Sequence, residues 1–95
     1  MSEKNLLKKI LETEFVAGVE TDWDEIRRFV NDPEFPGRKR EFKNQLADAI
    51  MHGTISPAEF EELTAVDRDD QDDVNSFLKE VIWNRLYENE PVSIR

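Results

Sequence analysis

The side chains that could do chemistry in this sequence are one histidine and many carboxylates, because cysteine is absent. His52 has no serine, cysteine or metal-ligand pattern around it, so it predicts neither a catalytic triad nor a zinc site. We expect it at a helix C-terminus, where a positive charge is favoured. An acid–base pair of carboxylates would need a partly dry cleft, and we expect these acids on solvated helix faces. The sequence therefore favours a protein that is not an enzyme, with no cofactor and no metal.

One spacing of acids invites a test for calcium. Asp69, Gln71, Asp73 and Glu80 stand at positions 1, 3, 5 and 12 of an EF-hand loop. Position 6 is Val74, whereas the loop needs glycine there for its sharp turn. An apolar helical stripe also begins at Val74, so we expect helix and not a calcium loop.

A short basic run, formed by Arg38, Lys39, Arg40 and Lys43, is the local exception in an acidic chain. Such a run could contact the phosphates of a nucleic acid. We favour ion pairs within the protein or with a partner.

Acidic side chains concentrate in one segment of the chain. The whole sequence has 22 acids against 13 bases and a net charge of −9. Residues 59–73, called the acidic segment below, contain eight acids against one base, Arg68. These acids are Glu59, Glu61, Glu62, Asp67, Asp69, Asp70, Asp72 and Asp73. They could steer a basic protein into contact, or they could cap helices and keep the protein soluble. Capping explains Glu59, Asp70 and Asp73 but not the whole cluster.

Two aromatic residues are second candidates for partner contacts. Trp83 falls one residue beyond the apolar stripe of the last expected helix, and Tyr87 continues the same side. Either side chain could be half exposed and anchor a partner. Packing in the core is the favoured interpretation, because aromatic residues at helical spacing usually pack.

The apolar pattern predicts an all-α fold, a compact bundle of about five helices in a single domain over residues 1–95. A helix can start at Ser2, and Gly18 is expected to end it. Asp22 and Ser56 carry N-cap patterns, and Gly53 is expected to end the third helix. Glu59 completes a predicted capping box with Ser56.

The first and last helices have clear apolar stripes. The first stripe contains Leu6, Leu7, Ile10, Leu11 and Phe15, and it could pack within the monomer or pair with another chain. The last contains Val74, Phe77, Leu78, Val81, Ile82 and Leu86. A flexible tail is expected at about 88–95. No stretch reads as a signal peptide or membrane span, so we expect a cytoplasmic protein without membrane contact.

Residues 42–87 resemble small immunity proteins of bacterial contact-dependent growth inhibition systems. The resemblance rests on Leu46, Ala49, Ile50, Gly53, Ile55, Ser56, Pro57, Glu59, Phe60, Glu61, Glu62, Leu63, Thr64, Val74, Phe77, Leu78, Trp83 and Tyr87. It implies a protein that binds the toxic C-terminal domain of a cognate toxin, often a nuclease, and blocks it in the producing cell. Binding residues differ between members, so the resemblance assigns no site residue.

These observations predict an immunity protein whose acidic segment, with Trp83 and Tyr87, binds a basic toxin domain. The alternative is a small acidic regulatory adaptor that docks on a basic host or transcription-associated protein. Nucleic-acid binding through residues 38–43 is a third possibility, and an enzyme is the least favoured class.

Overall fold

The computed structural model describes residues 5–88 and 90–92, so the helix start expected at Ser2 lies outside it. Four separate helices come first: α1 (Leu6–Glu14), α2 (Trp23–Val30), α3 (Arg38–His52) and α4 (Pro57–Thr64). A continuous last helix has three parts: α5 (Gln71–Phe77), the π-helical turn η1 (Leu78–Trp83) and α6 (Asn84–Leu86). The described residues contain no strand, and the predicted all-α fold of about five helices is confirmed.

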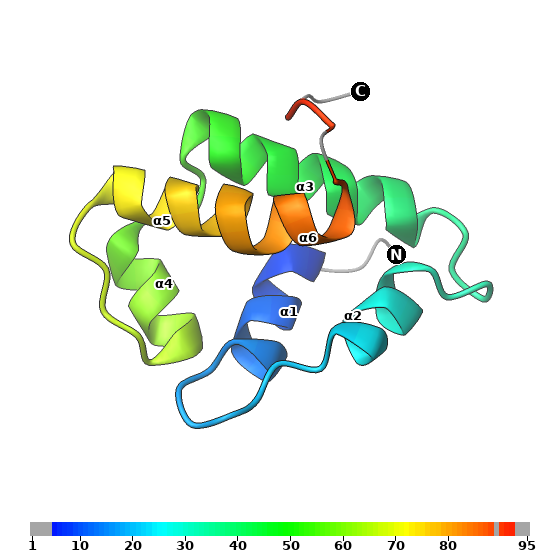
Figure 1. The fold of residues 1–95 in the computed structure, drawn as a ribbon, viewed down its shortest axis with the longest axis horizontal. Coiled ribbons are helices and arrows are strands. Elements are labelled where there is room, and N and C mark those ends of the chain that lie inside the picture. Colours follow the sequence, from blue (N-terminus) through cyan, green and yellow to red (C-terminus); the bar gives the residue numbers. More distant parts are fainter. Residues whose placement is uncertain (1–4, 89, 93–95) are drawn as a thin grey trace.

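The helices surround one core (Figure 1). α3 and the last helix lie side by side and run in opposite directions, α1 crosses below them, and α4 and α2 lie at opposite ends. The largest fully buried side chains are Trp83, Phe42, Phe60, Leu6, Leu7, Leu11, Ile26, Leu46, Ile55, Leu78, Ile82 and Val74. The stripe of α1 therefore packs within the monomer, which decides between the two possibilities that its sequence left open.

Local capping begins α2 and α4 where the sequence predicts. Asp22 Oδ1 accepts a hydrogen bond from the backbone N–H of Glu25 at 3.1 Å. Ser56 Oγ accepts one from the backbone N–H of Glu59 at 3.1 Å, and Pro57 follows Ser56 at the start of the helix. Each cap satisfies a backbone donor that has no partner within its own helix.

The N-terminus of α1 is capped from a distant helix. Gln45 Oε1, on α3, accepts hydrogen bonds from the backbone N–H groups of Leu6 at 2.6 Å and Leu7 at 3.2 Å. Asn5 Oδ1 adds a local cap on Lys8 N–H at 3.0 Å. The Gln45 side chain thus joins α1 to α3 through two backbone donors that would otherwise lack a partner.

Gly18 does not end α1, contrary to the prediction. The helix ends at Glu14, and Gly18 adopts a φ of +87° in the turn that follows. Phe15 leaves the helix, and its ring meets those of Trp23 and Phe77 edge to face, with centroids 5.7 and 5.8 Å apart. Phe15 thus contacts α2 and α5 at the point where α1 ends, four residues before the predicted end at Gly18.

Gly53 ends α3 in the left-handed conformation, as predicted, with a φ of +61°. A Cβ atom at this position would lie 3.2 Å from Cδ of Gln71. The Gln71 side chain has little freedom to move, because its Nε2 donates to the backbone oxygen of Ile55 at 2.7 Å and to Asn75 Oδ1 at 3.0 Å. An added methyl group would therefore meet both backbone strain and a held side chain.

The substitution Gly53→Ala is expected to lower the free energy of unfolding by about 1–2 kcal/mol. Denaturant unfolding measures the change. Gly37→Ala is the control, because Gly37 has a φ of −80° and open space around its Cα, and we expect a change of at most about 0.5 kcal/mol there. Equal losses at the two glycines would contradict this interpretation of Gly53.

The π-helical turn η1 corrects the predicted stripe of the last helix. Its backbone hydrogen bonds span five residues instead of four, so the turn contains an additional residue. Val81 consequently faces outward and is 37% exposed, whereas Trp83 faces inward and is 0% exposed. The regular helical period placed Val81 in the stripe, which is wrong; it placed Trp83 beyond the edge of the stripe, but the favoured interpretation of Trp83 as a core residue agrees with its burial.

Part of the expected tail returns to the bundle. The backbone oxygen of Glu90 accepts a hydrogen bond from Trp83 Nε1 at 2.8 Å, and Val92 packs against the core. Residues 90–92 therefore contact the body of the protein, while residue 89 and residues 93–95 of the expected tail lie outside the described residues.

Candidate partner-binding surface

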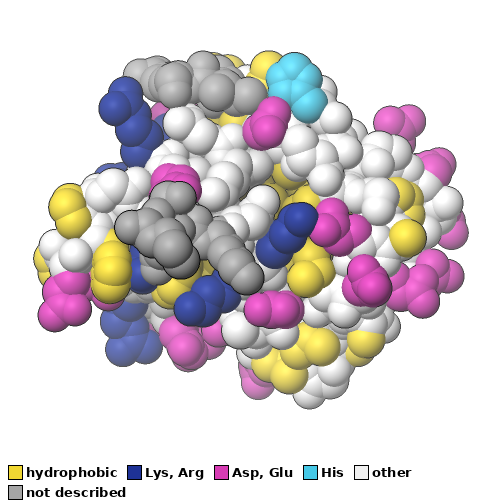
Figure 2. All heavy atoms as spheres, turned by 180° about the vertical axis from the view of Figure 1, so that it is seen from behind, with side chains coloured by type: hydrophobic (Ala, Val, Ile, Leu, Met, Phe, Trp, Pro, Cys, Tyr) yellow, Lys and Arg dark blue, Asp and Glu magenta, His cyan; other side chains and the backbone are white. Residues whose placement is uncertain are grey.

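The acidic segment covers one end of the molecule. It extends from α4 through the connector 65–70 into the first turn of α5. In Figure 2 that end shows Asp and Glu side chains and no Lys or Arg side chain, whereas the visible Lys and Arg side chains lie, with further acids, toward the opposite end and in the middle of the face. The charge of the chain is thus unevenly distributed over its surface.

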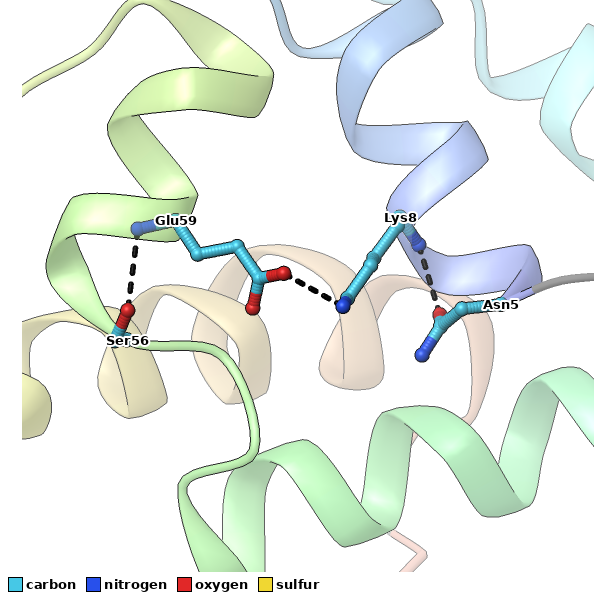
Figure 3. A network of polar contacts seen from close by, with 4 residues as sticks. All are labelled: Asn5, Lys8, Ser56 and Glu59. Atoms are coloured by element: carbon cyan, nitrogen blue, oxygen red, sulfur yellow. Dashed lines mark hydrogen bonds and ion pairs between the residues drawn. The ribbon is translucent and has the colours of Figure 1, made fainter.

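Three acids of this segment serve the fold. Glu59 Oε2 lies 2.6 Å from Lys8 Nζ and ties α4 to α1 (Figure 3). Asp70 Oδ1 caps α5 by accepting from the backbone N–H of Asp73 at 2.9 Å. The Asp73 carboxylate accepts from Asp69 N–H at 3.1 Å and lies 3.5 Å from Arg68 Nη1.

The partner of Glu59 corrects one expectation. Ser56 caps the helix as predicted, but the Glu59 carboxylate points to Lys8 rather than closing a capping box with Ser56 (Figure 3). An ion pair of this partial exposure stabilises a protein by at most about 1 kcal/mol. The capping explanation was therefore right about the helix start and wrong about the role of this side chain.

The other five acids are exposed and form no ion pair within the described part of the chain. We call them the five-carboxylate surface: Glu61, Glu62, Asp67, Asp69 and Asp72. Because no cation of the described residues pairs with them, their charges remain available to an external cation.

The backbone that carries these acids is held in place. Ala65 adopts a left-handed φ of +59° at the end of α4, and the buried Thr64 hydroxyl accepts from the backbone N–H of Val66 at 3.1 Å. Arg68 lies over the rings of Phe60 and Phe77, with Cζ 5.3 and 4.4 Å from their centroids. Arg68 thus anchors the connector, a role that no local sequence signal marked.

Trp83 and Tyr87 do not join this surface. Trp83 is 0% exposed and Tyr87 is 9% exposed, and their ring centroids lie 4.8 Å apart. The half exposure that the sequence left possible is not found, and the favoured interpretation as core residues is confirmed. In this conformation neither side chain offers a partner a large contact area.

Burial raises the pKa of Tyr87 to about 12, and the nearby charge of Glu90 adds to the effect. The folded state thus holds the phenol proton more tightly than the unfolded state, whose pKa is about 10. This contribution to stability is complete below pH 10 and is lost as the pH rises toward 12. Tyr87→Phe is expected to abolish this part of the alkaline destabilisation, as measured by denaturant unfolding between pH 9 and 12. An unchanged pH profile would contradict the assignment.

Arg38, the first residue of the basic run, is buried in the fold. It is 7% exposed and stacks on the rings of Phe29 and Phe35, with Cζ 4.2 and 4.1 Å from their centroids. Its Nη1 donates to the backbone oxygen of Phe29 at 3.1 Å and lies 3.9 Å from Asp32 Oδ2. The expected internal use of the run is confirmed at this position.

Of the other three residues in the basic run, one forms an ion pair within the described part of the chain and two do not. Lys43 Nζ lies 3.0 Å from Glu90 Oε1, so it too is paired inside the protein. Lys39 and Arg40 are exposed and have no ion pair within the described residues. The cations that remain for an external ligand are therefore fewer than the sequence suggests.

His52 and most of the residues tested as calcium ligands lie in helices. His52 is the last residue of α3, as predicted, and its side chain is 60% exposed, 3.9 Å from Asp48. Gln71 and Asp73 lie in the first turn of α5 and use their side chains in hydrogen bonds within the fold. Among the described residues, no group of three or more potential ligands is placed to hold a metal ion.

Comparison of the chain with protein families, curated proteins and solved structures gives no match. The described helices include none that is long and apolar enough to cross a membrane. The fold and the position of the acidic segment define the class of protein: a small all-α domain with acidic side chains at one end.

Proposed function

We propose that this chain is an immunity protein that binds and neutralises the toxic C-terminal domain of a bacterial toxin. The five-carboxylate surface is the observation that carries the proposal. Nuclease domains are basic where they hold nucleic acid, so a surface of unneutralised carboxylates on a held backbone complements them in charge. The proposed place of action is the cytoplasm of the cell that produces the toxin.

The way the carboxylates are displayed favours recognition over mere solubility. Acids that only keep a protein soluble can be scattered, whereas these five occur within twelve residues of one another, from Glu61 to Asp72. The connector between them is fixed by Arg68 and Thr64. A pre-organised charged surface speeds association and loses less side-chain and loop freedom on binding.

A pull-down from the lysate of the source organism, read by mass spectrometry at low and moderate salt, tests the proposal. Capture of the C-terminal part of a large secreted protein, whose toxic activity the chain then blocks in vitro, would support it. Weaker capture at moderate salt is expected, because exposed charges are screened over about 8–10 Å.

The alternative is a regulatory adaptor that docks on a basic cytoplasmic protein through the same carboxylates. Capture of a polymerase subunit or a transcription factor, without any toxin domain, would favour the adaptor and contradict the immunity proposal. The gene neighbourhood gives a second test, since an immunity gene should directly follow a large toxin gene.

A further inference from the structure

A groove opens at the end of the molecule opposite the acidic segment. It has a volume of about 440 Å³ and lies between α2, the first half of α3, α6 and Glu90. In Figure 1 these elements lie on the side away from α4 and the start of α5. Three cations line the groove, namely Arg27, Lys39 and Lys43, together with the apolar Val30 and Leu86.

The charge of this groove departs from that of the whole chain. The chain carries −9, yet the described residues that line the groove include three cations and one acid, Glu90. Glu90 is paired with Lys43 at 3.0 Å, whereas Arg27 and Lys39 form no ion pair within the described residues. Two cations therefore line one groove without an ion-pair partner in the described part of the chain.

The Glu90 carboxylate already lies against one cation of the groove. This carboxylate comes from the segment after α6 and lies on Lys43 Nζ, whose ammonium also lies 4.8 Å from the centroid of the Tyr87 ring. The Glu90 carboxylate thus forms an ion pair with Lys43, one of the three cations that line the groove. Because the Glu90 side chain is 48% exposed, water already reaches the ion pair and a stronger anion can compete for the lysine.

Tyr87 supplies an unused donor at the same place. It lines the groove, is 9% exposed, and its buried hydroxyl has no hydrogen-bond partner in the part of the chain that the structure describes. A buried hydroxyl without a partner costs about 1–3 kcal/mol. Displacement of the neighbouring Glu90 carboxylate by a ligand would give this hydroxyl an acceptor.

We propose that this groove binds a small molecule that carries a phosphate group. The phosphate oxygens would replace the Glu90 carboxylate on Lys43 and contact Arg27 and Lys39, while Val30 and Leu86 would receive the apolar part of the molecule. Guanidinium and ammonium groups are the usual partners of phosphate. The volume lies within the range of small-molecule sites, about 300–1,000 Å³.

Titration of the full ¹⁵N-labelled chain with inorganic phosphate, at constant ionic strength with chloride, tests the proposal. We expect saturable shifts of the amide signals of Asn31, Lys39 and Tyr87, with a Kd on the order of 1 mM for this minimal probe. Acetate at the same ionic strength is expected to bind about tenfold more weakly, because it has one charge and fewer acceptors. Shifts that rise linearly without saturation, or equal binding of acetate, would overturn the proposal.

Two pairs of variants separate the groove from general surface charge. Arg27→Gln is expected to raise the Kd about tenfold, whereas Arg28→Gln, an exposed neighbour on α2 outside the groove, should leave it nearly unchanged. Glu90→Gln is expected to lower the Kd about threefold by removing the competing carboxylate, and Glu88→Gln is its matched control. Equal effects within either pair would show that only net charge matters and would overturn the site.

Discussion

Replacing Trp83 with alanine is expected to lower the free energy of unfolding by about 3–5 kcal/mol. The indole is fully buried, its N–H donates to the backbone oxygen of Glu90, and its ring packs on Tyr87. The truncation would leave a cavity and a carbonyl without its donor. Denaturant unfolding followed by circular dichroism measures the loss, which is large for a domain whose whole stability is typically about 5–15 kcal/mol.

Val81→Ala is the matched comparison for the Trp83 variant, because both residues lie in η1. Val81 is 37% exposed, so we expect its truncation to cost less than about 1 kcal/mol. A regular α-helix would reverse this ranking, since it would bury Val81 and expose Trp83. A larger loss at Val81 than at Trp83 would therefore contradict the π-helical turn. If Trp83→Ala does not fold, Trp83→Phe, which keeps most of the ring volume, should still lose more stability than Val81→Ala.

Features set by neighbouring residues were predictable from the sequence. The caps of Asp22 and Ser56 reach a backbone donor three residues away, and Gly53 ends α3 through its own φ. Such local signals have their partners inside the window that a sequence pattern covers. These helix boundaries followed from them, and the all-α fold followed from the apolar pattern.

Features set by distant packing were not predictable. Gln45 caps α1 from 39 residues away, and Phe15 leaves α1 to meet Trp23 and Phe77. The π-helical turn is the clearest case, because a period of 3.6 residues per turn assumes an uninterrupted helix. One additional residue in a single turn exchanged the environments of Val81 and Trp83.

The candidate surface was predictable as a segment but not residue by residue. Charge counting marks residues 59–73, and cap patterns identify Asp70 as an acid used inside the fold. The counter-ion of Glu59 is Lys8, on another helix, so only the three-dimensional structure removes Glu59 from the available charges. Counting thus predicts the net charge of a surface, whereas packing decides which of its charges remain unneutralised.

Neutralising the five-carboxylate surface, by changing Glu61 and Glu62 to Gln and Asp67, Asp69 and Asp72 to Asn, is expected to weaken binding to the captured toxin domain about 100-fold at low salt. The loss should appear mainly as slower association, because these exposed charges act through long-range attraction. The salt dependence of the affinity should become flatter for the same reason. Surface plasmon resonance at several ionic strengths measures both effects.

A control variant with the same change in net charge shows whether position matters. Five exposed acids outside the acidic segment supply it: Glu12, Glu20, Asp24, Glu34 and Glu80. Neutralising these five should change the affinity by less than about tenfold, because they lie outside α4, the connector and α5, and exposed charges act weakly beyond a Debye length of about 10 Å. The fold of both variants should persist, since none of the ten carboxylates forms an ion pair in the described part of the chain. Equal losses of affinity in the two variants would mean that net charge alone drives association, and the five-carboxylate surface would no longer be the binding site.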